Sequence, residues 1–487
     1  MTERKKKTKN PLKIQIKEGA SVLKKISACA VETGMEVYAV GGFVRDLYMG
    51  REGTDIDFAV VGDALKFARA VKKKYRGGKV VAFPRFGTAM LQLENYQLEF
   101  VTARQEHYRP ESRKPRIREA DLLSDLTRRD FTINCLAMHI SEGRRGEIID
   151  TFGGIADIDR GVIRTPLDAE VTFNDDPLRI MRAIRFATQL QFQIEDRTYR
   201  AILETRERLR IISQERITEE FRKIMLAARP SVGLNLLQET GIMEIFLPEV
   251  SRLGGVEQRG KYHHKDVFYH TLEVVDNISK ISDKFELRLA ALFHDIAKPQ
   301  TKRFVEGIGW TFHGHEELGA RMMNRIGRRL RLPVQTIKSA QKIIRLHLRP
   351  MQLVDDSVTD SAIRRLMVDA GEDLGDLMKL CRADITSKNP AKVRRYLANF
   401  DRVEQKMREV EEKDRLSRFR PALTGNEIME ILNIPPGPRV GKIKQRIVDA
   451  ILDGVIPNEN QACREYLRKI TAEEDFSDQN RSNEEHS

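Results

Sequence analysis

The spacing of apolar residues changes once along the chain. The apolar runs 37–40, 79–83, 88–93 and 97–103 are short and strand-like, and residues 64–75 place their apolar side chains on one helical face. From about residue 160 onward, nearly every segment has helical spacing. The pattern therefore predicts an α/β head built on a small mixed sheet with helices, followed by an all-α neck, body and tail.

The run GGFVRDLYMGREGTDIDFAV, residues 41–60, carries the first candidate chemistry. A glycine pair after a strand, here ending at Gly42, lets backbone N–H groups approach a phosphate, and Arg45 adds a cation one turn later. Asp55 and Asp57 are two positions apart in a predicted strand, so their carboxylates share one face. Each feature alone is weak, since a glycine pair is commonly only a turn. Together they predict a nucleoside triphosphate site with Mg²⁺.

The rest of the predicted head adds three candidates. Glu99 lies in the strand 97–103 and is either a third carboxylate beside the aspartates or an exposed strand residue. Residues 105–118 contain two prolines and several basic residues without periodicity, which predicts a mobile loop. Next comes RRDFTIN, residues 128–134, in which two adjacent arginines, Arg128 and Arg129, precede Asp130. Adjacent arginines by themselves are more often a solvated face.

A helix is predicted around FNDDPLRIMRAIRF, residues 173–186. Proline suits a first helical position, so Asp176 before it has a structural explanation as an N-cap. Arg179, Arg182 and Arg185 recur every three residues and therefore lie on one slowly rotating face. Three guanidinium groups in line next to the head suit phosphates and base edges.

Histidines are concentrated in one part of the chain, since seven of the ten fall between residues 263 and 347. One histidine on a helix is usually a core or surface residue. A series of imidazoles with interspersed carboxylates can instead hold one or two divalent transition metal ions that activate water for phosphoester hydrolysis. The series comprises His270, His294, Asp295, His315, His347 and Asp384.

Composition narrows the class of partner. The 487-residue chain has a net charge of +13, which favours a polyanion such as nucleic acid. Four scattered cysteines form neither a metal-binding pattern nor a disulfide framework, which favours a reducing cytoplasm. No apolar run reaches the roughly 18 residues of a membrane span, so no membrane is expected as a partner.

The motif GGxVRD followed by DxD, together with RRDFTxN, resembles the signature of class II CCA-adding tRNA nucleotidyltransferases and bacterial poly(A) polymerases. The resemblance implies that Asp55 and Asp57 hold Mg²⁺, and that Arg129 and Asp130 hold the triphosphate and sugar. It also implies that Asp176 and Arg179 hydrogen-bond the edge of the incoming base. The family's leading glutamate of this last element is Asp175 here.

The histidine series resembles the HD superfamily of metal-dependent phosphohydrolases, and the C-terminal segment resembles the RNA-binding tail of CCA-adding enzymes. In that tail a Gly/Pro turn precedes Lys442 and Lys444, which implies a grip on a tRNA backbone. Oligomeric state stays open. The chain is expected to divide into six regions: a disordered basic arm (1–16), the nucleotidyltransferase head (17–160), a base- and RNA-binding neck (161–255), the HD domain (256–390), the RNA-binding tail (391–470) and a disordered acidic end (471–487).

These resemblances imply addition of CCA to tRNA 3′ ends from CTP and ATP with release of pyrophosphate, with HD phosphohydrolase activity as an accompanying possibility. One alternative is a bacterial poly(A) polymerase, although the sequence FPRFGTAML lacks the basic run such polymerases carry. Another is a partial enzyme that adds only CC or only A. The last is an HD phosphohydrolase whose head is an RNA-binding scaffold.

Overall fold

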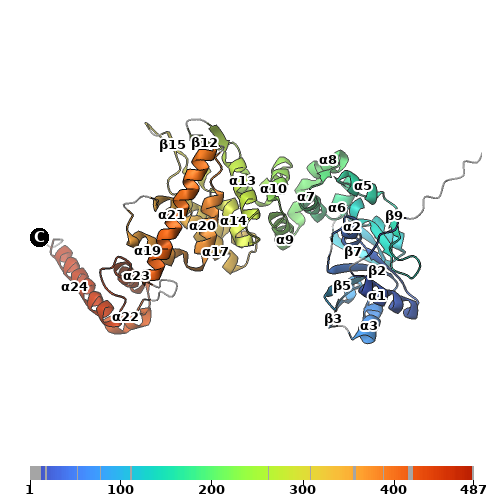
Figure 1. Ribbon diagram of the computed structural model, residues 1–487, viewed down its shortest axis with the longest axis horizontal. Coiled ribbons are helices and arrows are strands. Elements are labelled where there is room, and N and C mark those ends of the chain that lie inside the picture. The colour runs from blue at the N-terminus through green and yellow to red at the C-terminus, as the bar shows by residue number, and fades with distance from the viewer. Residues whose placement is uncertain are drawn as a thin grey trace, which may run out of the picture. The chain divides into compact units, whose positions relative to one another are not determined.

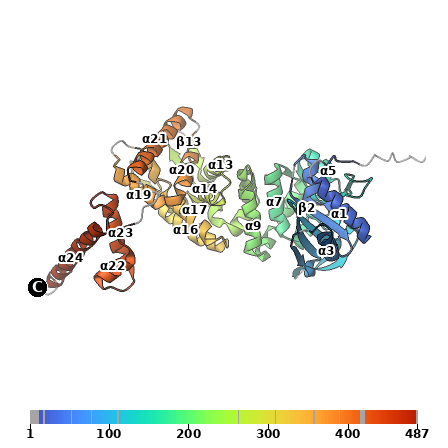
Figure 2. The ribbon, with the colours of Figure 1, turned by 60° about the horizontal axis from the view of Figure 1, so that its bottom comes forward.

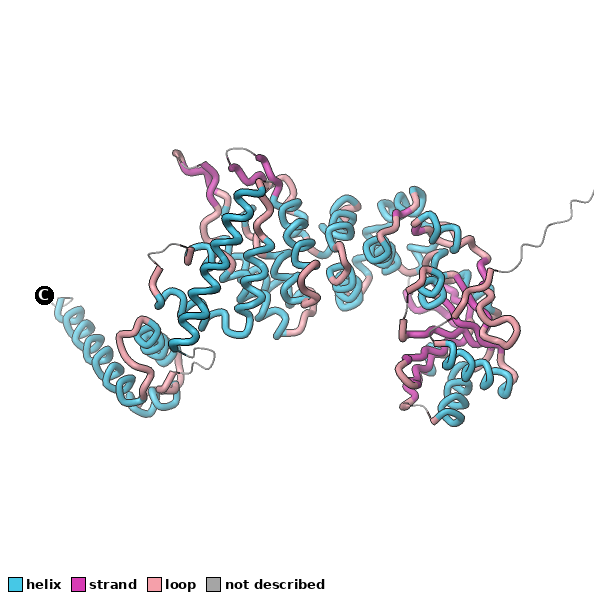
Figure 3. Tube along the Cα trace, in the orientation of Figure 1, coloured by secondary structure: helices cyan, strands magenta, loops and turns pink. Residues whose placement is uncertain are grey.

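The computed structural model describes the chain except for residues 1–11, 17–18, 52, 77, 110–111, 261–262, 308, 355–357, 388, 415–420 and 485–487. The chain forms two compact units, Met1–Ser251 and Arg252–Ser487. Strands gather in the head of the first unit and helices dominate the remainder, as Figure 3 shows. The predicted fold class, a mixed-sheet head followed by a mostly helical chain, is confirmed.

The head is built on a seven-stranded sheet in the order β3-β4-β5-β2-β1-β8-β9. Within it β2 and β5 run parallel, and the other neighbours pair antiparallel. The strands are β1 (Glu36–Val40), β2 (Asp55–Val61), β3 (Val80–Phe83), β4 (Thr88–Leu93), β5 (Tyr96–Thr102), β8 (Leu136–His139) and β9 (Ile148–Asp150).

Alternation along β2 separates the chemistry of the head from its core. Ile56 and Phe58 are fully buried, and Phe58 stacks on Phe100 of β5 with ring centroids 5.2 Å apart. The helix α3 (Ala64–Tyr75) covers this face and contacts α1 (Ala20–Thr33) (Figure 1). On the opposite face, Ala59 packs against α4 (Leu122–Thr127). Asp55 and Asp57 share the parity of Ala59, so their carboxylates point away from α3.

Two segments of the head differ from the expectations. Residues 105–118, expected as a mobile loop, form the antiparallel hairpin of β6 (Arg104–Arg109) and β7 (Ser112–Glu119). These two strands are polar and pair through main-chain hydrogen bonds. Their sequences therefore lack the alternation of apolar residues that would predict a strand. Part of the expected disordered arm is also paired, because Ile14 donates its N–H to the Gly146 carbonyl at 2.9 Å. Residues 1–11 lie outside the described part.

The remaining short elements of the head are α2 (Gly42–Tyr48), η1 (Pro84–Phe86) and η2 (Thr132–Asn134).

The neck is helical, as expected, and contributes α7 and α9 to the candidate site. One short parallel pair, β10 with β11, interrupts it. Its elements are α5 (Gly154–Arg160), β10 (Val162–Ile163), α6 (Ala169–Asp175), α7 (Leu178–Leu190), β11 (Gln193–Ile194), α8 (Asp196–Thr205), η3 (Arg206–Ile211), α9 (Gln214–Met225), α10 (Pro230–Glu239), α11 (Ile242–Phe246) and α12 (Pro248–Ser251).

The second unit begins with a helical body interrupted by two hairpins. Helices α13, α14, α17 and α20 pack together (Figure 2), and their shared core includes Val274, Leu289 and Ile343. The elements are β12 (Glu257–Gly260), β13 (His263–Asp266), α13 (Val267–Ser279), α14 (Phe285–Phe293), α15 (Lys298–Thr301), β14 (Arg303–Val305), β15 (Gly309–Thr311), α16 (His315–Arg329), α17 (Val334–Leu346), α18 (Arg349–Gln352), α19 (Asp360–Ala370), η4 (Gly371–Asp373) and α20 (Leu374–Ala383).

The end of the chain holds four further helices: α21 (Pro390–Asp414), α22 (Gly425–Leu432), α23 (Pro438–Leu452) and α24 (Asn460–Glu484). A small core containing Ile428, Ile447 and Leu467 joins the last three. The expected disordered end from residue 471 is wrong up to Glu484, because α24 continues through it. This polar stretch contains neither proline nor glycine, so nothing in it stops the helix. Among the described residues, no helix combines the length and apolar character that a membrane crossing needs.

Candidate active site and metal centre

The turn after β1 leaves room for an arginine of a distant segment. Gly41 has φ +73°, and a Cβ there would lie 2.7 Å from a terminal guanidinium nitrogen of Arg129. Only glycine therefore suits this position. Gly42 then opens α2 and, with Gly41, lines a cavity of about 960 Å³. The predicted phosphate turn is thus placed at a cavity, with Arg129 against it.

Three carboxylates lie together on β2 and β5. Asp57 is directly opposite Glu99 in the strand register, and both line the cavity, whereas Asp55 stands more exposed one pleat away. Burial raises the pKa of Asp57, with the Asp55 charge adding to this rise and Arg129 opposing it. Burial likewise raises the pKa of Glu99, and Asp57 adds to it. Crowded carboxylate oxygens of this kind fit a hard divalent cation.

Asp125 holds the two arginines of the RRD motif. Its carboxylate is buried and accepts from Arg129 at 3.0 Å through one oxygen and from Arg128 at 2.5 Å through the other. Sequence reasoning missed Asp125, although its spacing of three and four residues before the arginines on one helical turn is a local signal. Both arginines line the cavity.

Asp130 is the centre of a largely buried network in the wall of the cavity. It accepts from the Arg182 side chain at 2.6 Å and from the Asn134 amide at 3.0 Å. Asn134 in turn accepts from Arg45 at 2.7 Å, and Arg45 also pairs with Asp46. Burial opposes ionisation, but Arg182 and Asn134 lower the pKa of Asp130 to about 2. The network joins α2, the RRD segment and α7 into one charged wall.

The start of α7 places the candidate base-reading pair in the same cavity. Asp176 accepts from the Leu178 N–H at 3.2 Å, as an N-cap would, and its other oxygen lies 3.3 Å from Arg216 of α9. Arg179 donates to the Arg128 carbonyl at 2.6 Å. Both side chains line the cavity, so the structural explanation of Asp176 and a binding role are compatible.

Further along α7, Arg182 and Arg185 line the same wall. Arg185 pairs with the buried Glu220 of α9 at 2.7 Å, and burial lowers the pKa of Arg185 to about 10 despite that partner. Glu220 and Arg216 were not predicted as site residues. Their contacts lie 35 and 40 positions away in sequence.

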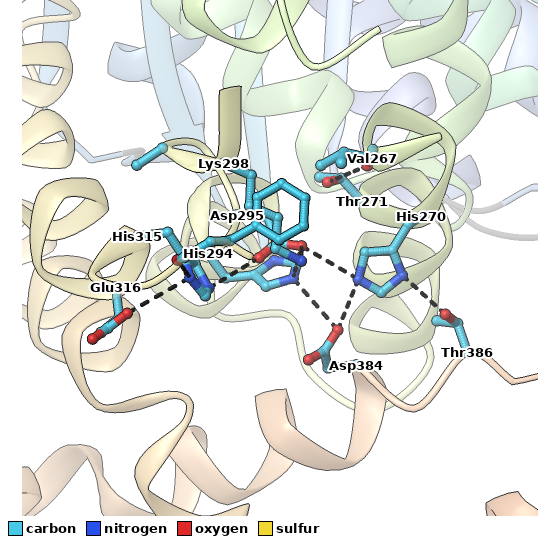
Figure 4. A network of polar contacts seen from close by, with 12 residues as sticks. Val267, His270, Thr271, His294, Asp295, Lys298, His315, Glu316, Asp384 and Thr386 are labelled. Carbon is cyan, nitrogen blue, oxygen red and sulfur yellow. Dashed lines mark hydrogen bonds and ion pairs between the residues drawn. The ribbon is translucent and has the colours of Figure 1, made fainter. Parts of the chain in front are cut away.

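In the second unit, the six candidate ligands come together. His270, His294 and Asp384 form one group, and Asp295, His315 and His347 form another; in each group one ligand atom per residue lies within 4.8 Å of the others. These residues come from α13, the end of α14, the start of α16, the end of α17 and the end of α20. Asp295 joins the two groups, because its carboxylate lies 3.2 Å from His294 of the first group and 3.4 Å from His315 of its own group (Figure 4).

Each of the four imidazoles has an outer partner for its Nδ1 atom. His294, His315 and His347 lie 2.6–2.8 Å from the carbonyl three residues earlier, and His270 lies 2.9 Å from the Thr386 hydroxyl. The Nε2 atoms of His294 and His315 are buried and face the carboxylate of Asp295, at 3.2 and 3.4 Å. An outer contact at Nδ1 with Nε2 left for a metal is the arrangement of metal-binding histidines.

Electrostatics at this cluster favour a cation. Burial disfavours a charged imidazole, yet the carboxylates of Asp295 and Asp384 raise the pKa of His294 to about 10. Burial lowers the pKa of His347 to about 4 and also lowers that of His315, which leaves neutral rings able to act as ligands. Mixed imidazole and carboxylate donors suit a divalent transition metal. Lys298, a residue that sequence reasoning did not select, lies 2.6 Å from Asp295.

Comparison with known proteins identifies the family. The sequence matches the Poly A polymerase head domain over residues 37–164, the probable RNA and SrmB-binding site of polymerase A over 191–253, and the HD domain over 267–387. It is 30% identical over 438 residues to the CC-adding tRNA nucleotidyltransferase of Thermus thermophilus, covering 88% of this chain and 93% of that protein. The chain belongs to the tRNA nucleotidyltransferase family. The resemblance stated from the motifs is therefore confirmed.

The chain is also similar to members of the tRNA nucleotidyltransferase family whose names give other products. The A-adding tRNA nucleotidyltransferase of Deinococcus radiodurans is 31% identical over 87% of the chain and 93% of its own length, and the CCA-adding enzyme of Bacillus velezensis is 31% identical over 90% and 95%. The crystal structure of the Bacillus stearothermophilus CCA-adding enzyme in complex with CTP aligns with a TM-score of 0.64 at 24% identity, covering 95% of this chain and all of that one. It supports the fold.

The structure brings the predicted head residues to one cavity, apart from Asp55, which shares the face of Asp57 without lining the cavity. In the tail, Lys442 and Lys444 are exposed on α23, while Ile443 between them packs into the small core. The lysines are thus available to a ligand, and their RNA contact stays a prediction.

Proposed function

We propose that this enzyme adds C, C and A in turn to the 3′ end of tRNA, using CTP and ATP and releasing pyrophosphate. One observation carries the proposal. Asp176 and Arg179, which offer an acceptor and a donor to a base edge, line the same cavity as the phosphate turn and Asp57. A cytosine or adenine amine can donate to the carboxylate, and uracil and guanine present carbonyl oxygens there instead.

The residues divide the work by their chemistry. Asp55 and Asp57, with Glu99 beside them, would hold Mg²⁺, and the raised pKa of Asp57 follows from its burial and from the neighbouring Asp55 charge. Bound Mg²⁺ would neutralise the phosphates and lower the pKa of the attacking hydroxyl. Gly42 offers its backbone to the triphosphate, and Arg129 supplies positive charge to it next to the carboxylates.

The Asp130 network would hold the sugar and keep α7 in register with the head. Arg182 is bound to Asp130, and Arg185 is anchored to Glu220, so the arginine line is fixed at two points of its length. Fixed guanidinium groups lose little conformational entropy on binding a nucleotide. Selection of the nucleotide would then depend on the position of α7, without a nucleic-acid template.

Substitution of the carboxylates and of the base-reading pair tests the proposal. Asp57→Asn should abolish incorporation of both CMP and AMP into tRNA lacking CCA, and retained incorporation would contradict the role of the carboxylate. Arg179→Ala should change the preference for CTP and ATP over UTP and GTP by about 5- to 150-fold, the loss expected for one good bidentate contact. Unchanged preference would remove Arg179 from base selection.

The histidine cluster supports a second activity, metal-dependent phosphoester hydrolysis. Its six ligands, the outer contacts of their Nδ1 atoms and the bridging place of Asp295 fit a centre for two divalent transition metal ions. When bound, such ions supply an activated water and neutralise a phosphate. Chelation should abolish hydrolysis of a phosphate ester such as p-nitrophenyl phosphate, and repletion with nickel or manganese should restore it. No hydrolysis with any metal would refute the activity.

We further propose that the enzyme works on tRNA in the cytoplasm. The exposed Lys442 and Lys444 of α23 and the net charge of +13 support binding to an RNA backbone. All four cysteines are buried and free, which supports a reducing compartment. Replacing both lysines by glutamine should weaken tRNA binding and flatten its salt dependence, and an unchanged salt dependence would exclude them.

A further inference from the structure

The β14–β15 hairpin of the second unit exposes two aromatic side chains. Phe304 is 59% exposed and Trp310 36% exposed. They are directly opposite each other in the strand register, with ring centroids 5.4 Å apart in an edge-to-face arrangement. A three-residue strand pair has little core of its own, so these rings are not needed to fill an interior.

Cations accompany the aromatic pair. The Lys302 ammonium lies 4.5 Å from the centre of the Trp310 ring, and Arg303 is exposed on the adjoining strand. The acidic residue of the hairpin, Glu306, lies at its turn. Aromatic faces interleaved with cations are the combination with which proteins bind unpaired nucleotides, since the rings stack on bases and the cations meet phosphates.

The hairpin is connected at both ends to the histidine cluster. Before it, Asp295 and Lys298 precede β14 by a few residues. After it, the Phe312 carbonyl accepts from His315 Nδ1 at 2.7 Å, and the Phe312 ring lies under the Lys298 ammonium. A nucleotide seated on the hairpin would therefore be near the residues proposed to hold metal ions.

We propose that the Phe304–Trp310 hairpin is a docking surface for unpaired nucleotides of an RNA, and that it presents their phosphoester to the histidine cluster. Presentation of the phosphoester rests on the phosphohydrolase activity proposed above, whereas binding of unpaired nucleotides does not. The occupant is an RNA segment rather than a free nucleotide because two exposed rings are accompanied by two cations, Lys302 and Arg303, which suit successive bases and phosphates.

Tryptophan fluorescence can test the binding of unpaired nucleotides to the hairpin. Trp310 is the single tryptophan of the chain, so intrinsic tryptophan fluorescence reports on this hairpin. Titrating the full-length protein, with EDTA present to prevent hydrolysis, with single-stranded hexaadenylate should give saturable quenching. An abasic oligomer with the same sugar–phosphate chain should give little. Absence of quenching by hexaadenylate, or equal quenching by the abasic oligomer, would overturn the proposal.

A matched pair of variants locates the contact. Phe304→Ala should weaken hexaadenylate binding by about 5- to 150-fold, the range that corresponds to one base–aromatic stack. Val305→Ala, at the next position on the same strand and on its other face, should bind as the unaltered protein does. Equal affinities of the two variants would contradict stacking on Phe304.

Two outcomes distinguish RNA docking from the binding of a free nucleotide and from the proposed phosphohydrolase activity. If AMP quenches Trp310 at the same concentration as hexaadenylate, the surface takes a free nucleotide and the RNA assignment is wrong. If hexaadenylate quenches but metal-loaded protein hydrolyses no phosphoester, the docking surface stands and the phosphohydrolase activity fails. Nucleotide addition to tRNA is measured separately and depends on neither result.

Discussion

Replacement of Asp130 by asparagine should destabilise the first unit through loss of one buried charge. In the folded protein Arg182 and Asn134 lower the pKa of Asp130 from 3.8 to about 2, against the effect of burial. At 1.36 kcal/mol per pKa unit, this shift corresponds to about 2–3 kcal/mol of stability at neutral pH. Asparagine keeps the shape of the side chain and removes the charge that Arg182 binds.

The sign of the pH dependence follows from a lowered pKa. Because the folded protein releases the Asp130 proton more readily than the unfolded chain does, the stabilisation is fully present above about pH 4. It is lost as the pH falls toward 2. The difference between the original protein and Asp130→Asn should therefore be largest at pH 7 and about half as large at pH 3.

Urea unfolding followed by two signals measures this difference. Circular dichroism reports on both units, whereas the fluorescence of Trp310 reports on the second unit, so the transition seen only by circular dichroism belongs to the first. The Trp310 transition should be unchanged and serves as the internal control. A loss near zero at pH 7, or a loss of equal size at pH 3, would refute the role of this charge pair.

Three other substitutions test separate parts of the account. Asp125→Asn weakens the anchor of Arg129 and should lower kcat/KM for nucleotide addition by about 10- to 100-fold, and unchanged initial rates would contradict it. Gly41→Ala forces a Cβ to within 2.7 Å of Arg129 and should weaken CTP binding by calorimetry about 10-fold or more; undiminished affinity would show that the turn can adjust. His294→Gln should lower the metal content found by elemental analysis, and full occupancy would remove His294 from the ligand set.

Local patterns were enough to predict several elements of the head. The helix expected at residues 64–75 and the strand expected at 88–93 have the observed bounds, because their apolar periodicity is set within the segment itself. The candidate ligands of both sites were also found from sequence, since carboxylates, arginines and histidines in close or repeated spacing are uncommon. Paired strands without apolar alternation, as in β6 and β7, gave no such signal.

What could not be predicted depends on partners far away in the chain. Glu220 becomes part of the site because the fold places it against Arg185, and Arg216 because the fold brings it into contact with Asp176. The aromatic hairpin is similar, because the sequence pattern did not single out Phe304 and Trp310. Only their exposure in the structure marks them as a surface.

The length of the product on tRNA tests the central claim most directly. Purified protein would be incubated with tRNA that ends at the discriminator base, with Mg²⁺, CTP and ATP together and each alone, and the products resolved to single nucleotides. The account predicts three added nucleotides with both substrates and two with CTP alone, followed by a stop. Two nucleotides in every mixture with CTP, a single A only on tRNA already ending in CC, or an extended adenylate tail would contradict it.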